Sequence, residues 1–536
     1  MVCRLFTRSG IAKKLSSLFS TSRKASSSTS PPTDWNSHSE FFNFTGARWV
    51  RNEEYEMAMR HVPFDMNELA KLVAQSVGAV KCVHVEKLGE GLYNKPFLFT
   101  MEDGSQVVGK VPNLSAGLPH FTTASEVATM DFARNILGTP VPKVLAWSSK
   151  ANESPVGAEF ILMEVAPGIP LSIVWNVMGI EARSKLILSL GKIQNAWAST
   201  TFSQYGSLYY ASDLDHPRPC LLTKRDGSQV EEPRFAVGPS NSRYQLDDGR
   251  INGIQSSNTS GQSVIEKSPA YSKWLNFHSR SWDFTAPRTY TRSRPKKLVA
   301  LNYYLQLINH LLPTDPSISS SFLWHNDLHD DNIFVNPEKP WEILSVIDWQ
   351  STDLRPLFDH VQKPFFLNYD GPALKLRERP KLPENLSEMS PEAQEEAKDL
   401  HYLMEICAYY KMVIYRDTRI LHHATEFTET KSFEMMLLGQ KLAEDGGAIY
   451  QWCVKELEED WPSLSGVQAA GNPSFPFHFY SEEISTIDQD AEDADRGMEL
   501  MRNLNMSLGD LCPENGLVRH ENYDVAKALL RQKKKS

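Results

Sequence analysis

The sequence predicts an α+β protein with two lobes: a small, β-rich N-terminal lobe over residues 40–168 and a larger, mainly helical lobe over residues 169–510. Two observations lead to this fold class. Strand patterns with one helical pattern precede residue 170, and long helical patterns follow it. The length of 536 residues allows a large core, and the composition, 41% hydrophobic and 23% charged, is ordinary for a globular protein.

The N-terminal lobe shows strand patterns before and after one helical stretch. Residues 85–113 predict two or three strands, because apolar residues alternate in "FLFTM", "EDGS" supplies a turn and "QVVGKV" resumes the pattern. Residues 122–137 have apolar side chains at helical spacing, and Thr123 followed by Glu126 is a capping-box pattern. Residues 157–168 read as a short apolar strand closed by Pro-Gly.

The C-terminal lobe shows two long amphipathic stretches, residues 180–200 and 392–417, and a Ser-Pro pair marks the start of the second. Between them, residues from about 213 to 294 are polar and rich in Gly and Ser, which predicts a long or partly disordered insertion: a lid, a partner site or a spacer. Residues 511–536 are expected to form a C-terminal tail, and its end, "RQKKKS", is predicted to be solvated.

Several classes of protein are excluded by composition. The formal net charge is −10 and no basic stripe is interleaved with aromatic residues, so we expect no nucleic-acid partner. No run of 18 apolar residues occurs, so we expect no membrane span. The six cysteines form no CxxC pair, which argues against a zinc ribbon or a disulfide framework.

Residues 1–33 differ in composition from the rest of the chain. They are rich in serine and hold no acidic residue, and Ile11, Leu15 and Leu18 fall on one helical face. Six basic residues lie among them: Arg4, Arg8, Lys13, Lys14, Arg23 and Lys24. This composition is typical of a mitochondrial transit peptide and predicts a mitochondrial location, with a disordered basic tail as the alternative.

Groups that bind protons and metals concentrate in "HNDLHDDN", residues 325–332. Asp327 is followed five residues later by Asn332, and Asp348 comes after two short apolar runs, "IFV" and "LSVI". If these runs form a hairpin, Asn332 and Asp348 reach the same end of it. Phosphoryl transfer needs a carboxylate to orient the attacking group, and an Asn and an Asp to hold Mg²⁺.

These motifs resemble the phosphotransferase enzyme family of aminoglycoside and choline kinases, whose usual loop is H-G-D-L-H-x-x-N followed by I-D-W or I-D-F. The resemblance covers roughly residues 40–370. It implies a two-lobed, protein-kinase-like fold, ATP and Mg²⁺ as cofactors, and transfer to a hydroxyl group. No A-P-E segment follows Asp348, which favours a small-molecule acceptor over a protein, and the acidic charge balance would suit a cationic one.

The resemblance also implies a role for each matching residue. Asp327 would be the catalytic base, His325 would brace its loop, and Asn332 and Asp348 would be the magnesium ligands. The nucleotide would be held by Gly89, Gly91 and Asn94 of the loop "LGEGLYN", by Lys110 and its partner Glu126, and by Glu164 and Val165 at the adenine hinge.

The sequence departs from the family pattern at two places. The glycine loop lacks a third glycine, which weakens the expected grip of backbone N–H groups on phosphate. Asp330 and Asp331 stand where many relatives have Pro-Gly, so extra negative charge lies beside the predicted metal ligands. We expect His329 to be structural, and Glu126 has a rival role at the start of its own helix.

Two other functions are compatible with parts of the sequence. His325, Asp327, His329 and Asp348 could form a two-metal hydrolase cluster, but the order H-x-D-x-H is unusual for one and Lys110 would have no purpose. The chain could also be a kinase-fold pseudoenzyme that acts as a mitochondrial scaffold or nucleotide-binding regulator.

Overall fold

The structure of the chain is a computed structural model. It describes residues 34–242, 289–291, 293–361, 363–369, 371, 374–376, 378–442, 447–511 and 516–533. The predicted transit peptide, residues 1–33, lies outside these ranges. The described residues form two compact units. Unit 1 takes its residues from Met1–Ala116, Leu145–Val165 and Ser507–Ser536, and unit 2 from Gly117–Val144 and Ala166–Met506.

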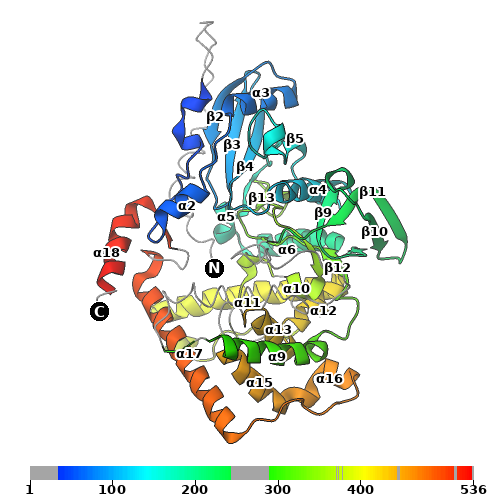
Figure 1. Ribbon diagram of the computed structural model, residues 1–536, viewed down its shortest axis with the longest axis vertical. Helices are drawn as coiled ribbons and strands as arrows, with labels where there is room; N and C mark the ends of the chain where they lie inside the picture. The colour runs from blue at the N-terminus through cyan, green and yellow to red at the C-terminus, as the bar shows by residue number, and fades with distance from the viewer. Residues whose placement is uncertain are drawn as a thin grey trace. The chain divides into compact units, whose positions relative to one another are not determined.

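Unit 1 is built on a five-stranded sheet with strand order β2-β3-β4-β6-β5 (Figure 1). Neighbouring strands from β2 to β6 pair antiparallel, as the predicted hairpins require. The strands are β2 (Cys82–Lys87), β3 (Asn94–Met101), β4 (Gln106–Pro112), β5 (Val144–Ser148) and β6 (Phe160–Glu164).

Helix α3 (Met66–Val77) covers one face of this sheet and was not predicted from the sequence (Figure 1). Asp65 caps its N-terminus by accepting a hydrogen bond from the Glu68 amide, and Gly78 ends it with a φ of 74°. Its buried face packs on Phe97 and Phe99 of β3 to form the core of unit 1. Fully burying side chains of this size stabilises the fold by about 1.5–3 kcal/mol each.

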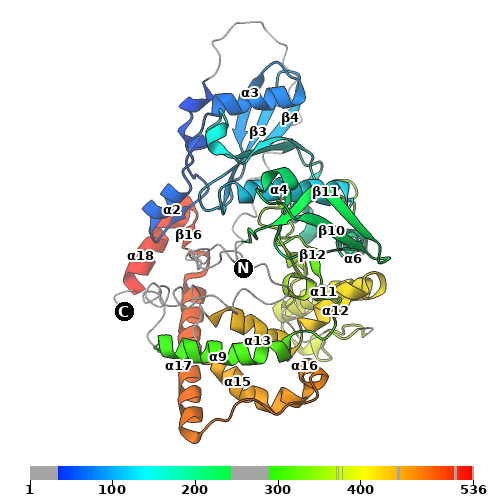
Figure 2. The same cartoon turned by 45° about the vertical axis from the view of Figure 1, so that its right-hand side comes forward.

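The described part of the C-terminal segment, 516–533, also belongs to unit 1 and forms regular secondary structure within the region expected to be a tail. Strand β16 (Leu517–Val518) pairs antiparallel with β1 (Arg48–Trp49). Helix α18 (Tyr523–Lys533) follows and lies beside α2 (Glu53–Met59), as Figure 2 shows. The Tyr523 hydroxyl donates to a Glu53 carboxylate oxygen over 2.5 Å. The short strand gives no readable alternation, which is why the sequence did not reveal it.

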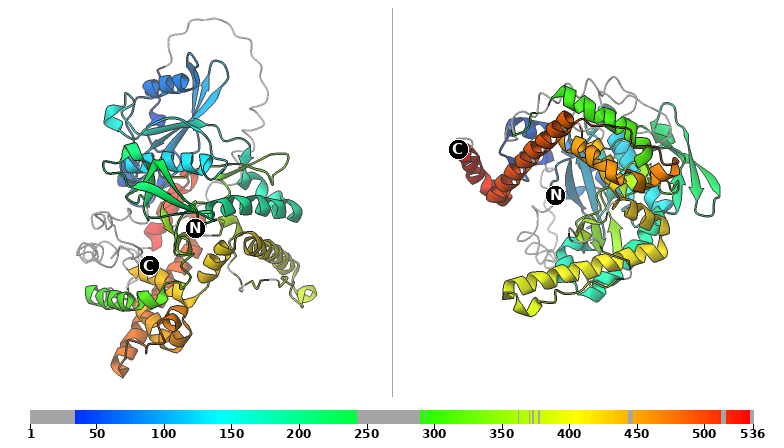
Figure 3. Two further views of the ribbon diagram at one scale, coloured as in Figure 1. Left: turned by 90° about the vertical axis from the view of Figure 1, so that its right-hand side faces the viewer. Right: turned by 90° about the horizontal axis from the view of Figure 1, so that it is seen from below.

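Unit 2 is mainly helical, as predicted. Its helices are α4 (Phe121–Asn135), α5 (Leu171–Val174), α6 (Ile180–Trp197), α9 (Arg294–Leu311), α10 (Leu357–His360), α11 (Pro391–Asp417), α12 (Arg419–Phe427), α13 (Lys431–Gln440), α15 (Ala448–Asp460), α16 (Ser465–Ala469) and α17 (Ser481–Leu508). The two long predicted helices, α6 and α11, run side by side (Figure 3). Within the described ranges, no helix combines the length and hydropathy needed to cross a membrane.

Unit 2 also holds two sheets. A three-stranded sheet has the order β14-β13-β7, and a six-stranded sheet has the order β15-β12-β8-β10-β11-β9. Their strands are β7 (Ile169–Pro170), β8 (Thr200–Phe202), β9 (Ser207–Tyr210), β10 (Pro219–Lys224), β11 (Gln229–Gly238), β12 (Ser321–Leu323), β13 (Ile333–Val335), β14 (Ile343–Val346) and β15 (Leu354–Pro356). The start of the predicted insertion therefore forms β10 and β11; its residues 243–288 lie outside the described ranges.

Two helix starts test the capping predictions. Ser390 caps α11, with its hydroxyl accepting from the Ala393 amide, as the Ser-Pro pair predicted. The capping box at Thr123 is wrong, because α4 begins at Phe121 and Thr123 already lies in its first turn. The residue before the helix, His120, has a φ of 67° and makes no side-chain cap. Glu126 is therefore not needed at the start of its helix.

His360, the last residue of α10, allows a test of stability against pH. It is buried, and neither ring nitrogen has a hydrogen-bond partner among the described residues. Burial, reinforced by the positive charge of Arg355, lowers the pKa of His360 well below its usual value of 6.5. The folded state then binds this proton less readily than the unfolded state, so the free energy of unfolding falls as the pH drops below about 6.5.

We predict that His360→Leu raises the free energy of unfolding by about 1 kcal/mol near neutral pH, because it removes two unpartnered buried nitrogens. The gain should be larger at about pH 5.5 than at about pH 7.5, and thermal melts at both values measure it. His84→Leu, at an exposed position of β2, is the control. A variant that melts at or below the wild-type temperature at both pH values would contradict the prediction.

Candidate active site

The loop between β12 and β13 and the end of β14 bring the predicted catalytic and metal-binding residues of unit 2 together. In the β13–β14 hairpin, Ile333 pairs with Val346. One residue further out, the Ile347 amide donates to the Asn332 carbonyl over 3.0 Å. Asn332 enters β13 and Asp348 leaves β14, so the hairpin predicted from the sequence carries both residues at one end.

The side chain of Asn332 ties this end of the hairpin to Asp327. Its Nδ2 donates to the Asp327 carbonyl oxygen over 2.9 Å, and its own backbone amide donates to the His329 carbonyl over 3.1 Å. With the amide nitrogen engaged, Oδ1 is the atom that Asn332 can offer to a cation. The Asp327 side chain is 52% exposed, so its carboxylate can reach a bound molecule.

His325 braces the loop from inside the core of unit 2. Its Nδ1 accepts from the Asp327 amide over 3.2 Å, and its Nε2 lies 2.9 Å from the Ile347 carbonyl oxygen, to which it donates. The ring lies against Trp197 and Trp349, at centroid distances of 6.4 and 4.7 Å. Burial lowers the pKa of His325. A neutral imidazole with its proton on Nε2 satisfies both bonds.

Asp348 has a backbone φ of 62°, in the left-handed region that non-glycine residues seldom adopt. Such a conformation costs of the order of 1 kcal/mol or more and persists only where the surrounding structure fixes it. A glycine would fit more easily, so the position retains a carboxylate at an energetic cost. Trp349, which follows, is a core residue, with its Nε1 donating to the Val346 carbonyl over 3.1 Å.

The acidic residues that replace Pro-Gly in the loop are held by local bonds. His329 is buried, its Nδ1 accepts from the Asp331 amide over 3.2 Å, and its Nε2 lies 3.6 Å from Asp327. The Ser172 amide donates to the Asp330 carbonyl over 3.2 Å, and the Ser172 hydroxyl donates to an Asp331 carboxylate oxygen. His329 therefore makes hydrogen bonds that support the loop. The Asp331 side chain, close to Asp327, remains 42% exposed.

Sequence reasoning missed a buried polar network behind the loop. Asn326 Nδ2 donates to the Ser351 carbonyl over 2.7 Å and lies 3.5 Å from Asp353 Oδ1. Arg355 bridges Asp353 and Asp359, with contacts of 2.9 and 3.1 Å. Burial raises the pKa of Asp353, although Arg355 opposes this effect. The cluster of charges in "STDLRPLFD" was the available signal, but ordinary surface residues would look the same.

The predicted nucleotide-binding residues of unit 1 lie on its sheet and on the loop before β3. Gly89 and Gly91 are exposed in the β2–β3 loop, neither has a positive φ, and a Cβ at either would meet nothing within 4 Å. Asn94 begins β3 and pairs with Pro112 of β4. Lys110 is buried on β4, opposite Ile161 of β6.

The remaining predicted residues lie elsewhere. Glu164 ends β6, and the boundary between the units falls between Val165 and Ala166. Glu126 is a buried residue of α4 and belongs to unit 2, whereas Lys110 belongs to unit 1. The predicted residues thus form two groups, one on each unit.

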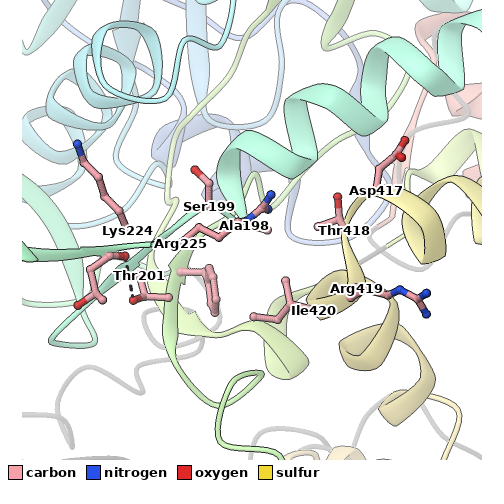
Figure 4. A pocket seen from close by; sticks show the side chains of 11 residues that line it. Ala198, Ser199, Thr201, Lys224, Arg225, Asp417, Thr418, Arg419 and Ile420 are labelled. Carbon is pink, nitrogen blue, oxygen red and sulfur yellow. Dashed lines mark hydrogen bonds between the residues drawn. The ribbon is translucent and has the colours of Figure 1, made fainter. Parts of the chain in front are cut away.

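A cavity of about 450 Å³ in unit 2 contains none of the predicted residues (Figure 4). Its lining comes from the end of α6, from β8 and β10, and from the start of α12. In the close view, the charged ends of Lys224 and Arg419 point away from each other, so they do not converge on one ligand. The catalytic and metal-binding residues predicted for unit 2 lie elsewhere, around Asp327.

The donor set at the end of the β13–β14 hairpin fits a magnesium ion. Asn332 offers an amide oxygen and Asp348 a carboxylate, and Mg²⁺ prefers oxygen ligands, often only one or two from the protein. A half-exposed carboxylate, Asp327, lies on the same loop and is held in place by its main-chain bonds to His325 and Asn332. This combination can orient a hydroxyl group beside a cation-bound phosphate.

Much of the chain is similar to known proteins. Residues 84–359 match the family described as "Phosphotransferase enzyme family". A subtelomeric hrmA-associated cluster protein of Aspergillus fumigatus is 31% identical over 364 residues, covering 61% of this chain and 69% of the relative. The protein of Yarrowia lipolytica named "Altered inheritance of mitochondria protein 9, mitochondrial" is 24% identical, covering 83% of this chain and 79% of its own. A crystal structure of a putative aminoglycoside phosphotransferase from Ralstonia eutropha aligns with a TM-score of 0.37 at 16% identity, covering 81% and 99%.

We predict that Arg355→Met lowers the free energy of unfolding by about 3 kcal/mol, because it leaves Asp353 buried without its cation. This value is at the low end for a broken buried pair, since the Arg355 side chain is itself 24% exposed. Denaturant unfolding measures the loss, and the double variant Asp353→Asn/Arg355→Met should lose less.

The matched control is Arg416→Met, which breaks the exposed pair between Arg416 and Asp417. That change should cost less than about 1 kcal/mol. Equal losses in the Arg355 and Arg416 variants would show that the network behind the loop of Asp327 contributes little to the free energy of unfolding.

Proposed function

The chain belongs to the phosphotransferase enzyme family, and from this premise we propose that it is an ATP- and Mg²⁺-dependent kinase that phosphorylates a hydroxyl group of a small molecule. The observation that carries the proposal is the β13–β14 hairpin, which carries Asn332 and Asp348 at one end while Asn332 also holds the loop of Asp327.

Asp327 is the proposed catalytic base. Its exposed carboxylate accepts a hydrogen bond from the acceptor hydroxyl and takes the proton as the new O–P bond forms and the bond to the leaving ADP breaks. Bound MgATP supplies the phosphoryl group and the neutralisation of its charge. His325 acts as a positioning residue, because its ring makes one hydrogen bond to the Asp327 amide and another to the Ile347 carbonyl.

The metal and nucleotide are assigned to separate groups of residues. Asn332 Oδ1 and the Asp348 carboxylate would hold Mg²⁺, which suits their oxygen chemistry. In unit 1, Lys110 would bind the α/β-phosphates and the backbone of Gly89 and Gly91 would face them. Gly89 and Gly91 are exposed and have open space around them, which supports this assignment. Asn94, Glu164 and Val165 complete the proposed nucleotide contacts of unit 1, and Glu126 of unit 2 keeps the nucleotide-binding role that the family resemblance implies.

The acceptor is proposed to be a small molecule, and a cationic one suits the exposed carboxylates of Asp327 and Asp331. A mitochondrial location is supported by the composition of residues 1–33 and by the printed name of the Yarrowia relative. A nucleotide-binding regulator without transfer activity is the second candidate, and the two-glycine loop is the observation that favours it.

We predict that Asp327→Asn lowers phosphoryl transfer, measured as ADP formation with a panel of small hydroxyl compounds, by at least about 100-fold. MgATP affinity should be nearly unchanged, because Asp327 contacts the acceptor and not the nucleotide. Asp226→Asn, in the exposed turn between β10 and β11, is the control. Comparable turnover in the Asp327 variant would refute its role, and wild-type nucleotide binding without any transfer would favour the regulator.

We predict that Asp348→Asn weakens binding of Mn²⁺ with ATP by at least about tenfold, equivalent to about 1.4 kcal/mol, because it removes a charged oxygen ligand. Electron paramagnetic resonance of free Mn²⁺ measures this affinity directly. Asp315→Asn, in the segment between α9 and β12, should leave it unchanged. Wild-type affinity in the Asp348 variant would exclude this residue as a ligand.

A further inference from the structure

We propose that Glu90 and Lys95 are positioning residues for the glycine loop, Leu88–Tyr93, and that the C-terminal segment, Leu517–Lys533, helps to hold the same loop. This inference rests on the proposed nucleotide-binding function and extends it to residues that touch no nucleotide. All of the contacts that carry it lie within unit 1.

The centre of the loop has a buried residue between two exposed glycines. Gly89 and Gly91 are exposed, whereas the side chain of Glu90 between them is only 2% exposed. A glutamate between two glycines would ordinarily extend into solvent, because a charged carboxylate loses hydration when it is buried. Here it turns inward and leaves the backbone of both glycines uncovered.

Glu90 is bound on both carboxylate oxygens. Its Oε1 lies 2.5 Å from Lys95 Nζ, and its Oε2 lies 2.8 Å from Lys87 Nζ. The Oε2 atom also accepts from the Thr45 amide over 2.9 Å. Lys87 Nζ also donates hydrogen bonds to the carbonyl oxygens of Glu40 and Asn43, over 2.8 and 2.7 Å. The loop is thereby tied to the chain that precedes β1.

Lys95 acts from the face of the sheet opposite Lys110. Lys95 pairs with Val111, and Pro96 pairs with Lys110. Residues paired across antiparallel strands share a face and consecutive residues alternate, so Lys95 lies on the face of Phe97, which α3 covers. The Lys95 side chain is fully buried and its pKa is lowered by burial. Lys95 is therefore not a second phosphate ligand beside Lys110.

The other arm of the loop rests on a cluster of buried apolar residues. Leu92 packs against this cluster, which consists of Phe44, Ala47, Trp49 and Leu517. The Leu92 carbonyl oxygen accepts from Arg60 Nε over 3.1 Å and from Asn113 Nδ2 over 3.0 Å. Because Leu517 belongs to β16, the C-terminal segment takes part in the support of the loop.

The C-terminal segment also reaches Glu90 through one intervening residue. His520 Nε2 lies 3.0 Å from the Thr45 carbonyl oxygen, and the Thr45 amide is bound by Glu90. The Arg48 guanidinium lies 3.5 Å from the centre of the Tyr523 ring and pairs with Glu53, which fixes β1 against α18. Strand β1 and the glycine loop are thus held by the same segment.

This arrangement has a physical reason. A buried ion pair contributes little net stability, since the desolvation of both ions offsets their attraction. Net stabilisation is therefore a weak explanation for burying Glu90 and Lys95, and ordering of the loop is the role that we assign to them. A loop that is already ordered loses less conformational entropy when it binds a ligand. Fixing the two-glycine loop from behind compensates for the missing third glycine, because the remaining backbone N–H groups are then held ready for phosphate.

The test compares the double variant Glu90→Gln/Lys95→Met with wild type. Hydrogen exchange of the Gly89–Leu92 amides is measured without nucleotide, and the affinity for AMP-PNP with Mg²⁺ is measured by calorimetry. We expect faster exchange at these amides and about a tenfold weaker affinity. The control is Glu68→Gln/Lys71→Met, which removes an exposed ion pair of α3 in the same unit and should change neither.

A second variant, His520→Ala, tests the C-terminal part at an exposed position where misfolding is not expected. It should raise exchange at the same amides, by less than the double variant does. Unchanged exchange in both variants would overturn the proposal. If wild type binds no AMP-PNP, the proposed function fails, and the exchange data still decide whether Glu90 and the C-terminal segment position the loop.

Discussion

The separation between the two proposed oxygen ligands, Asn332 and Asp348, is the constraint on which our account of this structure depends. An amide and a carboxylate can share one small cation only if the backbone holds them at a common point. The pairing of Ile333 with Val346 meets that demand with a three-residue strand, and the bond from the Ile347 amide to Asn332 closes its end. His325 then links the same end to Asp327, so the three residues proposed to act in catalysis and metal binding depend on one short hairpin.

Polar groups inside the core maintain that hairpin. The imidazole of His325 lies among tryptophans, and Asp353 is buried with Arg355 behind the loop. Buried groups of this kind add little to net stability, but each removes alternative arrangements that would leave a polar atom unpaired. The left-handed φ of Asp348 fits the same pattern, because strain is tolerated where the surroundings fix the backbone. Unit 1 repeats the principle with Glu90 and Lys95.

The fold class and the hairpin could be predicted because they follow local rules. Alternation revealed β3 and β4, helical spacing revealed α6 and α11, and the motif spacing placed Asn332 and Asp348 together. Features that depend on distant partners could not be predicted in this way. Strand β16 is too short to show a period, α3 was missed, and the inward turn of Glu90 requires Lys95 and Thr45. The capping box at Thr123 failed because His120, with its positive φ, starts the helix earlier.

The most direct test of the central claim is the thermal shift of the wild-type chain with ATP, with and without Mg²⁺. A ligand that binds only the folded state at about 100 times its dissociation constant adds about 2.7 kcal/mol of stability, so a rise of a few degrees is expected with Mg²⁺ present. The rise should be much smaller with ATP alone, because the proposed ligands Asn332 and Asp348 would act through the metal. No rise under either condition would contradict the assignment of a metal-nucleotide site to this hairpin.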